Sequence, residues 1–415
     1  MLAHASMTCA RTACPASGTT TDAGARQHDD DQRGNDLPLV LTDDQTMVRD
    51  SADAFFAGEA PVAELRRLRD TNDAAGFDRG LWSKMADMGF AGMLVPEAHG
   101  GAGFGYVAAG LVQEAAGRNL SLSPLLSTAI LAATALVRGG TPEQQAHYLP
   151  QIASGERLFA LAADEMPRHA PTMIATRAEA SGNGFKLNGV KGFVLDGHVA
   201  DTLIVAARTG GADDAADGIT LFLVDARAPG VAAHRRNMVD SRGAARVALT
   251  DVQVDGADVL GAVGDGWAVL ERVLDAGRAC LAAEMLGVAG ESFTRTIDYL
   301  KQREQFGVRI GSFQALQHRA AHLFCEVELA RSTTLRALVA LDADDAQVPL
   351  FASLAKAKAG EVAKLATDEG VQMHGGIGMT DDFDIGFFMK RARAARETFG
   401  DLAFHGDRLA ALMGY

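Results

Sequence analysis

The chain has 415 residues, of which 48% are hydrophobic and 22% are charged, and its formal net charge is −14. This composition is typical of a folded protein and excludes a largely disordered chain. The acidic balance disfavours a nucleic-acid partner, because phosphate binding requires clusters of Lys and Arg. The length corresponds to about two or three domains.

The N-terminal stretch, residues 1–37, is polar and rich in Ala, Thr, Gly and Asp. It lacks the continuous apolar segment of a secretory signal, so we expect a disordered leader. No apolar run in the sequence reaches the ~18 residues that a membrane-spanning helix needs. The four cysteines match neither a disulfide framework nor a zinc motif. We therefore expect a cytoplasmic protein without a membrane span or a metal site.

Three stretches with different hydrophobic periodicity follow. In residues 38–157 apolar side chains recur at helical spacing, and Thr42 reads as the N-cap of the first helix. Residues 158–265 consist of short β-branched or aromatic runs between Gly, Asn and Asp turns, which is typical of an all-β domain. In residues 266–415 the helical period returns in segments long enough for a bundle, namely 267–305, 314–341 and 348–372.

The common motifs for phosphate, zinc and acyl-serine chemistry are missing from the sequence. Three segments in its last third nevertheless carry the residue types that a large, flat, polyanionic cofactor needs. The first reads REQFGVRIGSFQALQHR and begins at Arg303. The guanidinium of Arg303 offers several N–H donors that can bind a pyrophosphate. Phe306 offers a flat apolar surface, and the side-chain amide of Gln314 can form hydrogen bonds with the edge of a cofactor ring. The alternative is a helical turn in which Arg303 is only a surface cation.

The second segment reads VQMHGGIGMT. Its glycines, Gly375 and Gly376 among them, allow backbone N–H groups to meet a phosphate or a diol, with Gln372 beside them. The alternative is a glycine-rich helix C-cap.

The third segment reads LDAGRACLAAE. Asp275 and Arg278 are three residues apart on one helix face, where they either meet a ligand or form an exposed ion pair. Glu284 follows among Ala, Leu and Met. A carboxyl group in such surroundings lies at a surface edge or is deliberately buried, and burial raises its pKa.

Taken in this order, the segments resemble the acyl-CoA dehydrogenase family of flavoproteins. The pair RxQFG and QMHGGIG carries the resemblance, which covers residues 41–415. It implies an N-terminal all-α domain, a middle β-barrel domain and a C-terminal four-helix bundle. The sequences of the segments IGSFQALQHR, QMHGGIGMT and FGD further resemble those of the pimeloyl-CoA dehydrogenase small-subunit branch.

The resemblance implies an FAD-dependent enzyme that converts an acyl-CoA to a trans-2-enoyl-CoA and passes its electrons to an electron-transfer flavoprotein. It implies that FAD is contacted from a neighbouring subunit by Arg303, Phe306 and Gln314, and that its diphosphate and ribityl region are held by Gln372, Gly375 and Gly376. A homodimer, a homotetramer or a heteromer with a homologous subunit would bring these groups together.

The resemblance also implies that Asp275 and Arg278 meet the CoA part of the substrate. Asp401, near the end of the chain, is a further candidate for a ribose hydroxyl of the cofactor. The segment that normally reads TEPGAGSD is ADEMPRHA here, residues 163–170, and the usual WIT is replaced by FVL at residues 193–195.

Two departures concern the catalytic base. The catalytic Glu of the family usually stands in a YEGT motif, and this sequence has Phe399 at that place, in TFGD. The family also has an alternative position for the base, and this sequence has Gly277 there. Glu284 lies two turns further along the same helix face, ~10.5 Å from Gly277. We take Glu284 as the candidate base, with a structural Glu bonded to a neighbouring helix as the alternative. Glu397 is a weaker candidate.

Two other functions remain open at this point. The chain can be a base-deficient subunit of a heteromeric acyl-CoA dehydrogenase, paired with a homologue that carries the base. It can also be a flavin monooxygenase on the same fold, which needs no C2 base.

Overall fold

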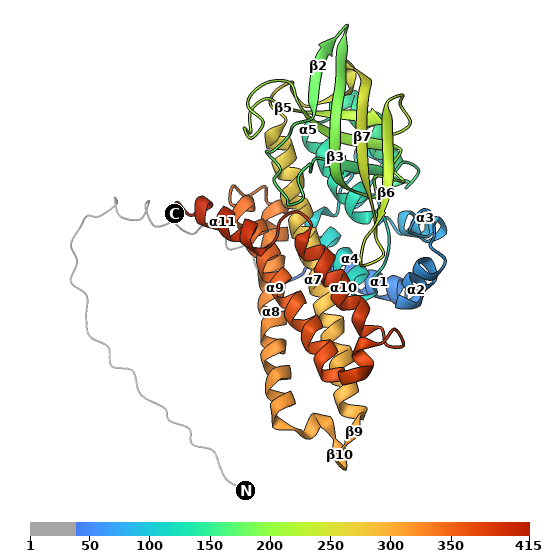
Figure 1. Cartoon of the computed structure of the whole chain (residues 1–415), viewed down its shortest axis with the longest axis vertical. Helices are drawn as coiled ribbons and strands as arrows, with labels where there is room; N and C mark the ends of the chain where they lie inside the picture. The colour runs from blue at the N-terminus through green and yellow to red at the C-terminus, as the bar shows by residue number, and fades with distance from the viewer. Residues whose placement is uncertain (1–38) are drawn as a thin grey trace, which may run out of the picture. The chain divides into compact units, whose positions relative to one another are not determined.

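The computed structural model describes residues 39–415 (Figure 1). The expected leader lies outside the described residues. In the part of the chain that the structure covers, no helix combines the length and the apolar character needed to cross a membrane.

The N-terminal domain is helical, as expected from its periodicity. The N-cap prediction is confirmed: the Thr42 hydroxyl accepts a hydrogen bond from the backbone N–H of Gln45, whose side chain in turn bonds the Thr42 N–H. The helices are α1 (Asp43–Glu59), α2 (Val62–Asp70), α3 (Arg79–Asp87), α4 (Gly105–Arg118), the π-helical η2 (Leu125–Ala132), α5 (Ala133–Gly139) and α6 (Pro142–Ala153). Of these, α4 is buried along most of its length because it lies between α1 and α7.

The middle domain is an eight-stranded sheet with the order β6-β7-β3-β2-β4-β5-β8, and β1 pairs with β4. Its strands are β1 (Phe159–Ala162), β2 (Arg177–Ser181), β3 (Gly184–Leu195), β4 (Thr202–Arg208), β5 (Ile219–Asp225), β6 (Val231–Asn237), β7 (Gly243–Asp255) and β8 (Val259–Leu260). This sheet is the domain expected as a β-barrel, and β6 and β8 stand at the two ends of its order.

Strand β4 shows how the sheet joins the rest of the molecule. Leu203 and Val205 point into an apolar cluster formed within the sheet, whereas Ile204 and Ala206 join the large cluster shared with the helices. Successive side chains of a strand point to opposite faces, so both faces of β4 are covered. One face of the sheet is thereby packed against the helical domains.

The C-terminal domain is a helical bundle built around one long helix, α7 (Trp267–Gln302). The other members are α8 (Gln314–Asp342), α9 (Val348–His374), α10 (Ile385–Glu397) and the short α11 (Leu402–Leu412). Helix α7 has 36 residues, which at 1.5 Å per residue gives a length of ~54 Å. It starts against β5 and ends at the opposite end of the bundle (Figure 1).

Helix α7 ends at Gln302, three residues before the end of the helix that the sequence pattern predicts over 267–305. Strands β9 (Glu304–Gln305) and β10 (Val308–Arg309) form a small hairpin instead. Its turn contains Phe306 with φ 55° and Gly307 with φ 77°, which a continuing helix does not allow. The hairpin therefore projects the RxQFG motif from the bundle end that lies away from the sheet (Figure 1).

Candidate functional site

Gly277 and Phe399, the two positions at which the resemblance expects a carboxylate, lie against each other. A β-carbon added at Gly277 would stand 3.1 Å from Cε2 of Phe399 and 2.7 Å from Cδ2 of Leu131. Phe399 is 6% exposed, so its ring is part of the core. The space that a side chain at position 277 would need is filled by apolar groups.

Phe399 also lies between two cavities. The first, which we call the open pocket, has a volume of about 610 Å³ and is lined by residues that include Asp164, His169, Phe193, Met238 and Phe399. The second, which we call the inner cavity, has a volume of about 10 Å³ and lies behind Phe399. Asp164, Phe193 and Phe399 line both, so these three residues form the boundary between them.

Asp275 and Arg278 form an ion pair of 2.8 Å on α7, but it is buried and not the exposed pair that the helix spacing alone allows. Asp275 also accepts a hydrogen bond of 2.7 Å from Arg408. The guanidinium of Arg278 lies 5.3 Å from the ring centre of Phe404. Each of the two side chains is thus enclosed by the protein itself, and their contact with CoA stays a prediction.

His169 links this ion pair to the open pocket. Its Nδ1 lies 2.9 Å from Oδ1 of Asp164, and its Nε2 lies 2.9 Å from Nη2 of Arg278. A carboxylate only accepts and a guanidinium only donates, so Nδ1 carries the proton and Nε2 accepts. Burial lowers the pKa of His169 more than the Asp164 carboxylate raises it. The imidazole is therefore neutral, and both of its nitrogens are already bonded.

Sequence reasoning did not single out His169. The only signal for it was the departure of residues 163–170 from the flavin-facing motif of the family. Its partner Arg278 is 109 residues away in the chain, so no local pattern could connect them.

Glu284 is held in a buried network of charges. It forms ion pairs with Arg242 and with Arg391, the latter at 3.1 Å, and Arg391 lies 2.8 Å from Asp240. Burial raises the pKa of Glu284, but the two arginines outweigh burial and hold the pKa below its usual value. The expectation of a raised pKa is wrong. A carboxylate held in its ionised form by two cations is a weak proton acceptor, so the geometry supports the structural alternative for Glu284.

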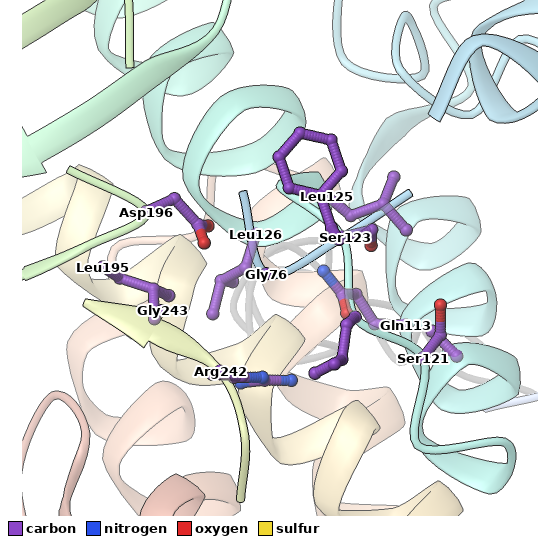
Figure 2. A pocket seen from close by; sticks show the side chains of 13 residues that line it. Gly76, Gln113, Ser121, Ser123, Leu125, Leu126, Leu195, Asp196, Arg242 and Gly243 are labelled. Carbon is purple, nitrogen blue, oxygen red and sulfur yellow. The ribbon is translucent and has the colours of Figure 1, made fainter. Parts of the chain in front are cut away.

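A small cavity beside this network is shown in Figure 2. Arg242, Asp196, Gln113 and Ser121 bring polar groups to it, and its volume is about 10 Å³. Among the described residues, Nε2 of Gln113 and Oγ of Ser121 are buried without a hydrogen-bond partner. The volume corresponds to about one water molecule, so this cavity is too small for a substrate.

The first set of expected cofactor residues, at the hairpin and at the helix ends that flank it, is exposed. Phe306 is 91% exposed, and Arg303 and Gln314 lie on the surface beside it. Within the described residues, the only aromatic contact of the Phe306 ring is an edge-on one with Phe313, at 6.3 Å between ring centres. The contact of these residues with FAD stays a prediction.

The second set of expected cofactor residues lies at the same end of the bundle. The rings of Tyr299 and His374 stack with centroids 4.4 Å apart, which joins the end of α7 to the end of α9. Gln372, Gly375 and Gly376 are exposed there, and a β-carbon added at either glycine would meet no described atom within 4 Å. The guanidinium of Arg303, the side-chain amide of Gln372 and the accessible backbone at Gly375 and Gly376 are groups that suit a phosphate-bearing ligand.

These surface donors lie far from the open pocket of the same chain. The donors lie at the C-terminal end of α7, whereas the open pocket is lined by residues of the sheet domain and by Phe399, which packs against Gly277. The 25 residues of α7 from Gly277 to Gln302 correspond to a separation of ~38 Å along the helix. An FAD shared between two subunits, as the resemblance implies, stays a prediction.

Asp401 and Glu397, the remaining candidates, have structural partners. The Asp401 carboxylate caps α11 by accepting a hydrogen bond of 2.9 Å from the backbone N–H of Phe404. Glu397 forms an exposed ion pair of 3.0 Å with Arg393 on α10. The role of Asp401 toward a ribose stays a prediction.

Comparison with known proteins agrees with the succession of the three domains. Residues 42–156, 163–257 and 264–413 match the family models of the N-terminal, middle and C-terminal domains of acyl-CoA dehydrogenases. The short/branched chain specific acyl-CoA dehydrogenase of Rattus norvegicus is 33% identical over 362 residues, which are 86% of this chain and 82% of the relative.

Two solved structures extend the comparison. Butyryl-CoA dehydrogenase from Megasphaera elsdenii aligns with a TM-score of 0.83 and 25% identity, over 91% of this chain and 100% of that chain. A chain of the ChsE4–ChsE5 complex from Mycobacterium tuberculosis aligns with a TM-score of 0.82 and 28% identity, also over 91% of this chain and 100% of the other.

Proposed function

This chain belongs to the acyl-CoA dehydrogenase family of FAD-binding oxidoreductases, and we propose that it acts in the dehydrogenation of an acyl-CoA to a trans-2-enoyl-CoA. One observation carries the proposal. The chain presents an open pocket at its sheet and, at the far end of α7, a separate exposed set of phosphate donors. Two subunits that place the phosphate donors of each at the open pocket of the other would complete an FAD site from these halves.

In this proposal the residues of the chain bind and orient the cofactor. Arg303 and Gln372 would donate hydrogen bonds to the FAD diphosphate of a neighbouring subunit, and the exposed ring of Phe306 would cover its adenine end. FAD, when bound, supplies the acceptor for the hydride that leaves C3 of the substrate. Phe193 and Met238 give the open pocket an apolar wall, which excludes water from the reaction.

The C2 proton is where this chain departs from its family. The contact between Gly277 and Phe399 leaves no room for a carboxylate at the first position and puts a phenyl ring at the second. This observation favours a second candidate function, a base-deficient subunit that pairs with a base-bearing homologue. The similarity to a chain of the ChsE4–ChsE5 complex supports a heteromer of this kind.

We propose domain boundaries after residues 157 and 265, an electron-transfer flavoprotein as electron acceptor, and a cytoplasmic location. The motifs IGSFQALQHR and QMHGGIGMT support placement near the pimeloyl-CoA dehydrogenase small-subunit branch. We also propose Gln314, Gly375 and Gly376 as FAD contacts, and Asp275 and Arg278 as residues that orient the CoA side of the site.

Anaerobic titration of the purified holoprotein with a panel of CoA thioesters tests the proposed function. Bleaching of the flavin absorbance by one or more thioesters is the expected result for the enzyme alone. If the chain binds FAD but is reduced only after co-expression with a homologous subunit, the second candidate function is correct. A chain that binds no FAD in either form would contradict both.

A further inference from the structure

The turn that carries Phe399 has an unusual backbone. Phe399 has φ 59° and the next residue, Gly400, has φ 110°. Glycine accepts such values readily, but phenylalanine strongly disfavours them. A backbone of this kind persists only where the surrounding structure holds it in place.

Two buried basic side chains hold this turn from different helices. Nε of Arg278, on α7, donates a hydrogen bond of 3.2 Å to the carbonyl oxygen of Phe399. Nζ of Lys356, on α9, donates hydrogen bonds of 3.0 Å to the carbonyl oxygens of Gly400 and Arg396. Arg278 and Lys356 are 1% and 2% exposed, so solvent does not compete for these bonds. The turn is therefore fixed, and the direction of the phenyl ring is fixed with it.

The position of the ring decides how much apolar space the open pocket has. On its far side lies the inner cavity, whose lining includes Leu131, Leu161 and Leu274. The ring packs against Gly277, where only the missing side chain lets it approach. Removing the ring would join the inner cavity to the open pocket and add the volume of the ring itself.

We propose that Phe399 is the specificity-determining residue of this site: its ring closes the apolar space behind the open pocket and limits the length of the acyl group that the chain accepts. The inference rests on the proposed function, because the acyl group must enter the open pocket to meet the ring. The strained turn is then the device that keeps the ring in this position, with Arg278 and Lys356 as its positioning residues.

Phe399→Gly is the variant that tests this inference, because glycine tolerates the positive φ and keeps the turn while it removes the ring. The ligands are S-alkyl-CoA thioethers of increasing chain length, which cannot be dehydrogenated, and their affinity for the holoprotein is measured by calorimetry. For the wild type, the affinity should stop rising once the alkyl chain of the thioether is long enough to reach the Phe399 ring. For the variant it should continue to rise, about four-fold for each further methylene that enters the cavity.

Met166→Ala is the matched control. Met166 is 47% exposed and lines only the open pocket, so its loss should leave the limiting chain length unchanged. Phe399→Leu, which leaves part of the space open, should shift the limit by less than the glycine variant. It also provides the comparison if Phe399→Gly does not fold, as judged by melting temperature and flavin content.

The possible failures can be told apart. Identical length dependence in wild type and both Phe399 variants, with flavin content intact, would overturn the role of Phe399 and leave the proposed function standing. If neither the wild type nor any variant binds a thioether, the proposed function fails together with the inference.

Discussion

The phenyl ring of Phe399 lies in the space that a side chain at Gly277 would occupy, with Cε2 only 3.1 Å from a β-carbon built there. The two residues come from the turn before α11 and from the first half of α7, and they are the two positions at which the sequence resemblance expects a catalytic carboxylate. Apolar groups thus fill the space at both positions.

Installing a carboxylate at each position gives a pair of opposite expectations. Phe399→Glu places a carboxylate at the border of the open pocket, where it should raise the rate of flavin reduction by an acyl-CoA by ~10²-fold or more. Gly277→Glu meets Leu131 at 2.7 Å, so it should lower the melting temperature and yield no gain in rate. Anaerobic stopped-flow absorbance measures both. Equal rates for the wild type and Phe399→Glu would mean that the chain already has a base.

Glu284→Gln should lower the free energy of unfolding. It leaves Arg242 and Arg391 without their carboxylate, and breaking a buried ion pair in this way costs roughly 3 kcal/mol of the free energy of unfolding. Glu328→Gln, on the exposed face of α8, is the control and should change the free energy by less than about 1 kcal/mol. Denaturant unfolding measures both. A Glu284→Gln protein of unchanged stability whose flavin is reduced ~10²-fold more slowly would restore Glu284 as the base.

Arg303→Ala should weaken the retention of FAD. Loss of a hydrogen bond from a charged donor costs about 1.5 to 3 kcal/mol, which corresponds to a roughly 10- to 150-fold higher Kd. Arg309→Ala removes a neighbouring exposed cation from the same hairpin and should retain FAD as the wild type does. Flavin fluorescence during dialysis gives the Kd of each variant. Equal loss in both variants would point to a general charge effect and not to a specific contact.

Asp196 should make stability depend on pH. Burial raises its pKa to about 6, although Ser127 donates a hydrogen bond of 2.7 Å to its carboxylate. The unfolded carboxyl binds its proton only below about pH 3.9. Between these values the folded state holds more protons, so the contribution of Asp196 becomes more favourable as the pH falls from about 6 to 4.

Asp196→Asn removes this charge and keeps the acceptor for Ser127. The backbone at Asp196 has φ 57°, which asparagine also tolerates. The variant should be more stable than the wild type by on the order of 1–3 kcal/mol at pH 7, and the difference should shrink toward pH 4. Melting temperatures across this pH range measure the effect, with the exposed Asp298→Asn as control. A difference that does not change with pH would show that the charge of Asp196 has no part in it.

The sequence by itself determined the succession of helical, β and helical domains, because hydrophobic periodicity and capping are local properties. Thr42 needs only Gln45, three residues away, to cap α1. The motifs around Arg303 and Gln372 were equally readable, since their residues lie on the surface and their packing in this chain does not alter them. Only the end of α7 differed, where Phe306 and Gly307 turn the chain into a hairpin.

Tertiary structure alone decided the charge state of Glu284 and the roles of the residues around Phe399. Along α7, Glu284 has apolar neighbours, which predict a raised pKa, but Arg242 and Arg391 come from 42 and 107 residues away and reverse the shift. Phe399 likewise meets Gly277 and Arg278 across more than a hundred residues of sequence. Electrostatic and packing energies depend on distances in space, and for residues so far apart in the chain only the folded structure sets those distances.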